Sequence, residues 1–232
     1  MFFAACNCLP RQKKFVPMRK LIIISNRLPF KIKKRGDKYE AKQSSGGLVS
    51  AIQSIPNDKR ITWIGAADFK KEVWDAFSKE HNDLDYDIVP VFLDKKVESL
   101  YYNGFSNTMI WPLFHYFPSY AEYEENFYSA YKTVNQQFAD AVKSVANEND
   151  LVWIHDYHLM LLPGYLKTGK KQISSSFFLH IPFPSYELIK FIPEDWRNEI
   201  LGSLLSCDVI GFQTSEYSSH FKRSLSYLMG IE

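Results

Sequence analysis

Polar, charged and aromatic residues follow five short apolar segments of this sequence, at the points where buried strands would end. In an open parallel sheet, ligands bind beyond the carboxyl ends of the strands. A single charged residue there is more often a solvated loop residue or, as Asp156 could be, a helix cap. The shared location of all five groups is stronger evidence, and it predicts one ligand site at this edge. The groups are residues 25–27, 65–66, 155–158, 180–184 and 213–215.

A pair of glycines and an arginine suit a phosphate group. Gly46 and Gly47 precede a helical stretch, and small residues let backbone N–H groups approach an anion at the positive end of a helix. Arg27 adds a planar cation that matches phosphate oxygens. The complete G-x-G-x-x-G spacing is absent, which disfavours a nicotinamide cofactor. A Gly-Gly pair is more often an ordinary loop, so that alternative stays open.

The segment from residue 101 to residue 116 is too aromatic for an ordinary surface loop. It reads Tyr-Tyr-Asn-Gly-Phe-Ser-Asn at 101–107 and Trp-Pro-Leu-Phe-His-Tyr at 111–116. Flat aromatic faces with nearby hydroxyl and amide groups suit a sugar, whose C–H face packs on rings. A segment that only fills the core explains the same composition equally well.

Several other chemistries fit the sequence badly. There is no Gly-x-Ser-x-Gly elbow and no Walker A sequence, which disfavours these hydrolase and kinase types. His155 and His158 lie three residues apart without a zincin pattern. The pair Cys6 and Cys8 has the wrong spacing for most zinc sites. We therefore expect neither a metal ion nor a cofactor.

Composition and charge describe an ordinary globular chain. Of 232 residues, 46% are hydrophobic and 23% charged, and the net charge is +2, which gives no reason to expect a nucleic-acid partner. No apolar run approaches the roughly 18 residues that span a membrane. The start is apolar for only six residues before basic residues follow, the reverse of a secretory signal. We expect a cytoplasmic protein whose residues 1–18 form a poorly ordered extension.

Short apolar strands alternate with helical patterns, which predicts an α/β fold with a doubly wound, mostly parallel, Rossmann-like sheet. A β-hairpin near residues 30–43, around the turn at Gly36, is inserted after the first strand. The expected strands are 21–25, 61–65, 86–93, 150–154, 176–180 and 208–212. The expected helices cover 44–55, 69–79, 122–146, a stretch ending at 167, 193–206 and 215–229.

Seven motifs, taken in order, closely resemble the trehalose-6-phosphate synthases, which are retaining glycosyltransferases of the two-Rossmann-domain (GT-B) type. The resemblance runs from about Arg19 to the end of the chain and matches only the N-terminal half of that family. It implies one acceptor-binding domain over 19–232. The motifs lie at residues 25–29, 45–48, 102–107, 111–115, 153–159, 178–184 and 207–213.

The resemblance implies trehalose biosynthesis, with transfer of glucose from UDP-glucose to glucose 6-phosphate. The products are α,α-trehalose 6-phosphate and UDP, and the configuration is retained. By motif, Arg27 and Tyr102 would bind the acceptor phosphate and sugar, and Asp156 would accept hydrogen bonds from acceptor hydroxyls. Trp111 would form a wall beside the acceptor, next to Ile181, and help select its α-anomer.

The donor would meet a second set of residues. The resemblance implies that Gly46 and Gly47 approach the phosphates of UDP-glucose, and that His180 contacts the donor glucose near the reacting centre. His180 and Asp156 are then the catalytic positions. The family's front-face mechanism uses no enzyme nucleophile, so catalysis would rest on positioning and on stabilisation of the leaving diphosphate.

The family's second domain has no counterpart in these residues. The present sequence ends just past a helix, where a further strand would be expected. We therefore expect an excised domain rather than a truncated protein, with the missing C-terminal domain as its intramolecular partner. Exposed apolar surface would permit a homo-oligomer. The alternatives are a non-catalytic, sugar-phosphate-sensing or regulatory subunit and another nucleotide-sugar transferase. A degenerate subunit should have lost some of the acceptor residues, and all of them are present here: Arg27, Tyr102, Trp111, Asp156 and His180.

Overall fold

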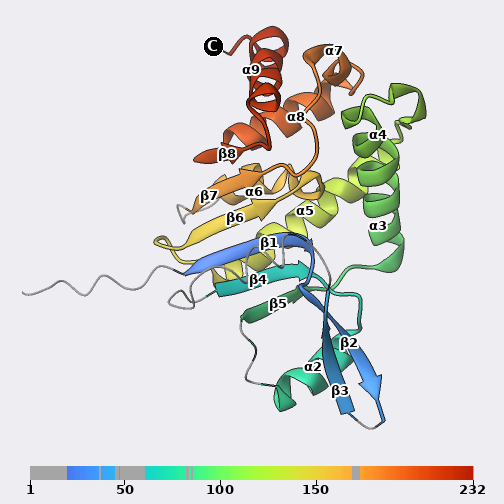
Figure 1. The fold of residues 1–232 in the computed structure, drawn as a ribbon, viewed down its shortest axis with the longest axis vertical. Coiled ribbons are helices and arrows are strands. Elements are labelled where there is room, and N and C mark those ends of the chain that lie inside the picture. The colour runs from blue at the N-terminus through green and yellow to red at the C-terminus, as the bar shows by residue number, and fades with distance from the viewer. Residues whose placement is uncertain are drawn as a thin grey trace, which may run out of the picture.

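The computed structural model describes residues 20–36, 38–44, 47, 61–81, 84, 86–168 and 173–231. Within them, six strands form one sheet in the order β5-β4-β1-β6-β7-β8, and every pairing in it is parallel (Figure 1). The predicted α/β fold is confirmed. The strands are β1 (Leu21–Arg27), β4 (Ile61–Ala66), β5 (Asp87–Val91), β6 (Leu151–His155), β7 (Ser174–Phe178) and β8 (Val209–Gly211).

The strand order reverses at β1, which pairs with β4 on one side and with β6 on the other. This is the order of a doubly wound Rossmann-type sheet, and its ligands bind at the switch point between the two halves. Ile22, Ile23 and Ile24 of β1 are fully buried. Burial of consecutive residues means that both faces of this strand are covered, as expected for a central parallel strand.

One strand is shifted along the chain from its expected bounds. The strand predicted at 176–180 is β7, which begins and ends two residues earlier. Its start was hidden because serine is a weak strand former, yet Ser175 is buried and the Ser176 hydroxyl donates to the carbonyl of Val152 at 3.2 Å. The chain leaves the sheet after Phe178, so His180 lies in the following loop, at the sheet's carboxyl edge.

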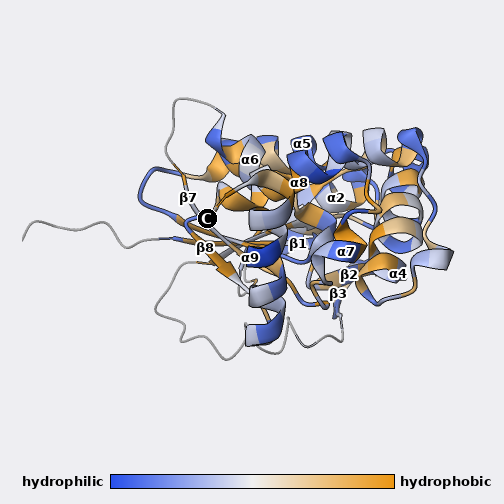
Figure 2. Ribbon diagram, turned by 90° about the horizontal axis from the view of Figure 1, so that it is seen from above, coloured by the Kyte–Doolittle hydropathy of each residue, from blue (hydrophilic) through white to orange (hydrophobic). Residues whose placement is uncertain are grey.

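Helices α5, α6 and α8 lie together on one side of the sheet (Figure 2). Their apolar residues share one core with Ile22, Ile64 and Ile154 of the strands. Four expected helices are confirmed to within a few residues: α2, α5, α8 and α9. The helices in chain order are α2 (Lys71–Glu80), α3 (Lys95–Ser99), α4 (Trp111–Phe114), α5 (Glu125–Val145), α6 (Leu162–Lys167), α7 (Tyr186–Ile189), α8 (Glu194–Leu205) and α9 (Ser215–Met229), with short 3-10 turns η2 (Pro118–Tyr120) and η3 (Tyr157–Leu159).

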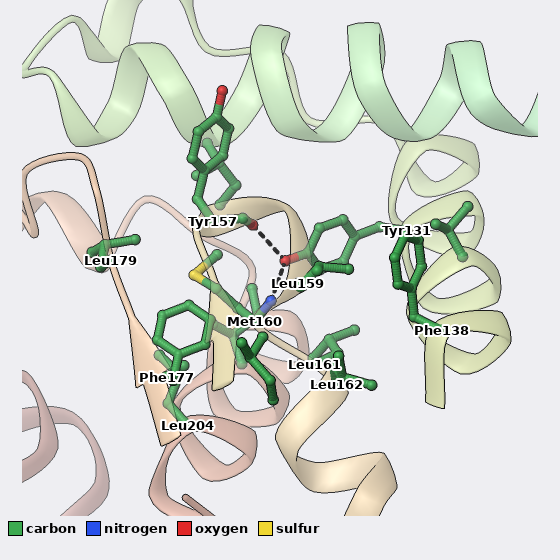
Figure 3. Close-up of a cluster of buried hydrophobic side chains, with 14 of the residues drawn as sticks. Tyr131, Phe138, Tyr157, Leu159, Met160, Leu161, Leu162, Phe177, Leu179 and Leu204 are labelled. Carbon is green, nitrogen blue, oxygen red and sulfur yellow. Dashed lines mark hydrogen bonds between the residues drawn. The ribbon is translucent and has the colours of Figure 1, made fainter. Parts of the chain in front are cut away.

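Tyr131 of α5 ties that helix to the turn that follows β6 (Figure 3). Its hydroxyl donates to the carbonyl of Tyr157 at 2.7 Å and accepts from the backbone N–H of Met160 at 2.9 Å. Asn135, one turn further along, accepts from the backbone N–H groups of Leu161 and Leu162. These bonds hold the residues after β6 in one position against the helix.

The predicted hairpin is confirmed. Strands β2 (Phe30–Arg35) and β3 (Lys38–Gln43) pair antiparallel as a separate two-stranded sheet. Gly36 in its turn has a φ of 63°, a left-handed conformation that glycine adopts at little cost. The hairpin projects from the main sheet beside α2 (Figure 1). The ring of Phe30 packs 5.9 Å from that of Phe77 in α2.

The aromatic segment forms a π-helix, η1 (Leu100–Ile110), which the sequence did not predict. Tyr101, Phe105 and Met109 are fully buried, so most of the segment fills the core. A Cβ at Gly104 would lie 2.6 Å from the ring of Phe127, so this position requires glycine. No helix in the described residues is long and apolar enough to cross a membrane. The helix expected at 44–55 and the extension at 1–18 fall outside the described residues, apart from Ser44 and Gly47.

Candidate active site

A cavity of about 670 Å³ opens at the carboxyl ends of β1 and β6, which is the switch point of the sheet. Its volume is in the range of sites for small organic ligands. The hairpin, η1 and the turns after β6 and β7 complete its wall. It is lined by Ser25, Asn26, Arg27, Leu28, Lys31, Lys33, Lys42, Gln43, Ser44, Trp63, Tyr102, His155, Asp156, His158 and His180.

The end of β1 is fixed by neighbouring side chains. Ser25 Oγ accepts from the indole N–H of Trp63 at 2.8 Å and donates to the carbonyl of Arg27 at 2.8 Å. Asn26 Oδ1 accepts from the hydroxyl of Tyr101 at 2.9 Å. These bonds hold the strand end in place, while Arg27 itself is exposed at the cavity. A fixed backbone with an exposed guanidinium is well suited to receive an anion.

Arg27, Tyr102 and His158 form a stack of flat groups. The guanidinium carbon of Arg27 lies 4.9 Å from the centroid of the Tyr102 ring. That ring is nearly parallel to the His158 imidazole, at 9° and a centroid distance of 5.5 Å. Burial, with a smaller contribution from the positive charge of Arg27, lowers the pKa of His158 to about 3. His158 is therefore neutral at pH 7, and Arg27 carries the charge of this group.

Asp156 stands where β6 ends, in an unusual backbone conformation. Its φ is 76°, and one of its carboxylate oxygens accepts from the backbone N–H of Tyr157 at 3.0 Å and of His180 at 3.3 Å. Burial raises the pKa of this carboxyl, against the lowering effect of those hydrogen bonds. A left-handed non-glycine residue costs about 1–3 kcal/mol, and such strain gathers at functional sites. The strained turn aims the carboxylate into the cavity that it lines.

Two further imidazoles, those of His155 and His180, also line the cavity. His155 Nδ1 lies 3.0 Å from His180 Nε2. Burial, together with the neighbouring His180, lowers the pKa of His155 to about 3. Burial also lowers the pKa of His180, opposed by the charge of Asp156. Both rings are therefore neutral at pH 7, and one donates its N–H to the other. The Gln213 amide donates to the His180 carbonyl at 2.8 Å, which fixes the loop.

Four of the predicted site residues meet in this cavity: Arg27, Tyr102, Asp156 and His180. Trp111 and Ile181 are not among its lining residues. The Trp111 side chain is 44% exposed and stacks on His115 at 4.1 Å, whereas Ile181 is buried.

The structure tests the predicted glycine pair only in part. Gly47 is exposed and has no atom within 4 Å of the place where a Cβ would stand. It does not line the cavity, and Gly46 lies outside the described residues.

Sequence reasoning missed the lysines of the hairpin. Lys31, Lys33 and Lys42 line the cavity, although they were read only as part of a hairpin. Alternating residues of a strand share one face, so the spacing of Lys31 and Lys33 contained the signal. Among the described residues, no group of three His, Cys, Asp or Glu side chains could hold a metal ion. Metal-free chemistry stays a prediction.

The strand order and the polar cavity at its switch point place this chain in the class of Rossmann-like ligand-binding domains. The chain belongs to glycosyltransferase family 20, whose profile matches residues 19–232.

Two relatives are named UDP-forming α,α-trehalose-phosphate synthases. That of Dictyostelium discoideum (synthase A) is 45% identical over 92% of this chain and 29% of its own length. That of Emericella nidulans is 42% identical over 91% of this chain and 43% of its own length. The chain thus spans less than half the length of these relatives.

Solved structures share the fold. A UDP-forming synthase from Burkholderia xenovorans in complex with glucose-6-phosphate superposes with a TM-score of 0.71 and is 25% identical, covering 90% of this chain and 43% of that one. A trehalose-6-phosphate protein from E. coli bound with UDP-2-fluoro glucose gives 0.73 at 27%, with 90% and 43% covered. The N-terminal domain of Candida albicans trehalose-6-phosphate phosphatase gives 0.76 at 27%, with 93% and 44% covered.

Proposed function

We propose that this chain is the acceptor-binding half of an α,α-trehalose-phosphate synthase. The enzyme transfers glucose from UDP-glucose to glucose 6-phosphate with retention, in trehalose biosynthesis. The observation that carries the proposal is the meeting of Arg27, Tyr102, Asp156 and His180 in one cavity at the switch point. The names of the relatives and the two ligands of the solved structures support it.

The cavity would hold the acceptor by its phosphate and by its sugar hydroxyls. Arg27 binds the phosphate of glucose 6-phosphate, and Tyr102, on which its guanidinium lies, orients both the cation and the sugar. Asp156 accepts hydrogen bonds from sugar hydroxyls. A carboxylate that is already held by two backbone N–H groups needs little reorganisation when a ligand arrives. Trp111 would form a wall next to Ile181 and help select the α-anomer of the acceptor.

In the chemical step, no group of the enzyme would form a covalent bond to the substrate. The acceptor hydroxyl attacks the anomeric carbon of UDP-glucose from the face that UDP leaves, and a phosphate oxygen of UDP takes its proton. His180, neutral and fixed by His155, would hold the donor glucose, and Gly46 and Gly47 would approach its phosphates. No metal ion or cofactor enters this scheme.

The proposal extends to the rest of the protein. Residues 19–232 are one acceptor domain, preceded by the extension 1–18. A C-terminal domain of the GT-B type supplies the cations for the diphosphate and the site for the nucleotide. We propose a cytoplasmic enzyme. The chain without its second domain would self-associate through the surface that this domain covers.

A second candidate function is a non-catalytic, sugar-phosphate-sensing subunit. The likeness to the N-terminal domain of a trehalose-6-phosphate phosphatase favours it, because this fold also occurs in a protein named for another activity. The presence of Arg27, Tyr102, Asp156 and His180 in the cavity favours the synthase. Both candidates require that the cavity bind a sugar phosphate.

A ligand-observed NMR titration tests that requirement. The chain should bind glucose 6-phosphate with a dissociation constant on the order of 1 mM, because the half-cleft is open to solvent. It should bind glucose less well. Arg27→Ala should remove about 1.5–3 kcal/mol of binding free energy, the range for a charged hydrogen bond, and with it the preference for the phosphorylated sugar. Arg223→Ala, on α9 and away from the cavity, is the control. A parent chain without that preference would overturn the proposal.

A further inference from the structure

The β2–β3 hairpin has two chemically different faces. Successive side chains of a strand point to opposite faces, and the register sets Lys31 opposite Lys42 and Lys33 opposite Glu40. Lys31, Lys33 and Lys42 line the cavity together with Arg27. One face of the hairpin thus faces the cavity and is rich in lysine.

The other face anchors the hairpin. Phe30 and Ile32 alternate with the lysines of β2, and the Phe30 ring packs on Phe77 of α2. Ile32 and Tyr39 are half-buried, whereas Lys33 and Lys42 are exposed. In Figure 1 the hairpin lies beside α2. The packing of the apolar face therefore keeps the basic face toward the cavity without a ligand being present.

The positive charge of this face is only partly balanced by the described residues, since Glu40 on the same face pairs with Arg35 at 3.6 Å. Lys31 has Asp68 at 3.8 Å, but no described carboxylate lies within 4.0 Å of Lys33 or Lys42. Four of the lining side chains carry a positive charge, against the single carboxylate of Asp156. Like charges directly opposite each other on a hairpin are destabilising, as Lys31 and Lys42 are. An anion bound between these side chains would offset their repulsion.

We propose that Lys33 and Lys42 form a second phosphate subsite, beside the one at Arg27. It takes a phosphoryl group of a bound sugar substrate, either the monophosphate of the acceptor or the diphosphate of the donor. The inference rests on the proposed function, which brings two phosphorylated substrates into one cavity. Ammonium groups on flexible stems serve as adjustable point charges, whereas the planar guanidinium of Arg27 fixes an orientation. β3 also leads through Ser44 to the glycines proposed for the donor.

The test compares two double variants of equal charge. Lys33→Gln/Lys42→Gln removes the subsite, and Lys34→Gln/Lys38→Gln removes two lysines of the same hairpin that do not line the cavity. Calorimetric titration with glucose 6-phosphate and with UDP-glucose, at low salt, measures both substrates. We expect about tenfold weaker binding of at least one of them in the first variant, and less than twofold in the control. The substrate whose binding is weakened shows which phosphoryl group occupies the subsite.

Folding and function can be separated in the same experiment. Lys33→Gln/Lys42→Gln should unfold at the same urea concentration as the parent or a higher one, because a like-charge pair is gone. Equal affinities of both double variants for both substrates would overturn the subsite, even if glucose 6-phosphate still bound through Arg27. A parent chain that does not prefer glucose 6-phosphate over glucose would instead overturn the proposed function, and the subsite with it.

Discussion

Two buried polar side chains of α5, Tyr131 and Asn135, are paired by hydrogen bonds, whereas His158 beside the cavity is not, within the described part of the chain. The Asn135 side chain is fully buried and takes part in four hydrogen bonds, two as donor and two as acceptor. Neither ring nitrogen of His158 makes a hydrogen bond among the described residues, and its Nδ1 lies 4.0 Å from a carboxylate oxygen of Asp156. One of those bonds of Asn135 even goes to the carbonyl of His158. The two regions share a backbone segment but differ in whether their buried polar side chains are hydrogen-bonded.

The contrast separates residues that stabilise from residues that wait for a ligand. A buried polar group without a hydrogen-bond partner costs free energy, and a ligand that forms a hydrogen bond with it would recover part of that loss. The cavity collects such features: an unpaired neutral imidazole at His158, a left-handed φ at Asp156, and Lys42 opposite Lys31. Tyr131 and Asn135 of α5, by contrast, are hydrogen-bonded to the turn after β6. Substitutions on the two sides should therefore affect different measurements.

The largest effect should follow from a substitution in the α5 core. Phe138 is fully buried, so Phe138→Ala should lower the free energy of unfolding by about 3–5 kcal/mol through lost burial and a residual cavity. Urea unfolding followed by circular dichroism measures it. Arg27→Ala, at the exposed end of β1, should change stability by less than about 0.5 kcal/mol. Similar losses for both variants would contradict the division between the two regions.

A smaller effect should appear as a dependence of stability on pH. The pKa of His158 is about 3 in the folded chain and about 6.5 when unfolded. The unfolded chain therefore binds the proton more readily. The stability from keeping His158 neutral is present above pH 6.5 and is lost as the pH falls toward 3. Between pH 7 and pH 5 this loss is about 2 kcal/mol.

His158→Gln isolates that contribution. Its free energy of unfolding should fall less steeply than that of the parent over the same pH range. Asp156, whose pKa is raised by burial, acts in the opposite direction, because it takes up its proton more readily when folded. It is present in both chains, and so is His155. Parallel pH profiles would show that the pKa of His158 is the same in the folded and unfolded chains, which would contradict its burial as a neutral group.

Sequence patterns predicted the sheet well, because the signal for a central parallel strand is local. A run such as Leu21 to Ile24 can be buried on both faces only in such a strand. The π-helix η1 was missed because its 11 residues follow no helical pattern of apolar residues, and its conformation depends on packing against α5. The start of β7 was missed because Ser174 and Ser175 pair with β6 by backbone bonds that composition does not reveal.

The site was predictable where it depended on strand ends. Arg27, Asp156 and His180 follow apolar strands and could be placed at one edge from the sequence. The contact between His155 and His180 could not be predicted from the sequence. The orientation of the lysine face toward the cavity could not be predicted either. Both depend on distances between segments far apart in the chain: 25 residues separate the two histidines. The orientation of the hairpin depends on Phe77, a residue that belongs to α2.

The smallest effect, and the sharpest comparison, comes from removing one hydroxyl from each region. Tyr131→Phe leaves the carbonyl of Tyr157 and the N–H of Met160 without their partner, so it should cost about 1–2 kcal/mol of stability. It should leave binding of glucose 6-phosphate within about twofold of the parent.

The Tyr102 hydroxyl has no hydrogen-bond partner among the described residues. Tyr102→Phe should therefore leave the urea midpoint unchanged and weaken glucose 6-phosphate about fivefold, through one lost bond to the ligand. Both variants remove the same atom from the same residue type, so differences in side-chain size do not enter. If Tyr102→Phe destabilised the fold and left binding intact, Tyr102 would belong to the core, as Tyr101 does, and the acceptor would have to bind elsewhere.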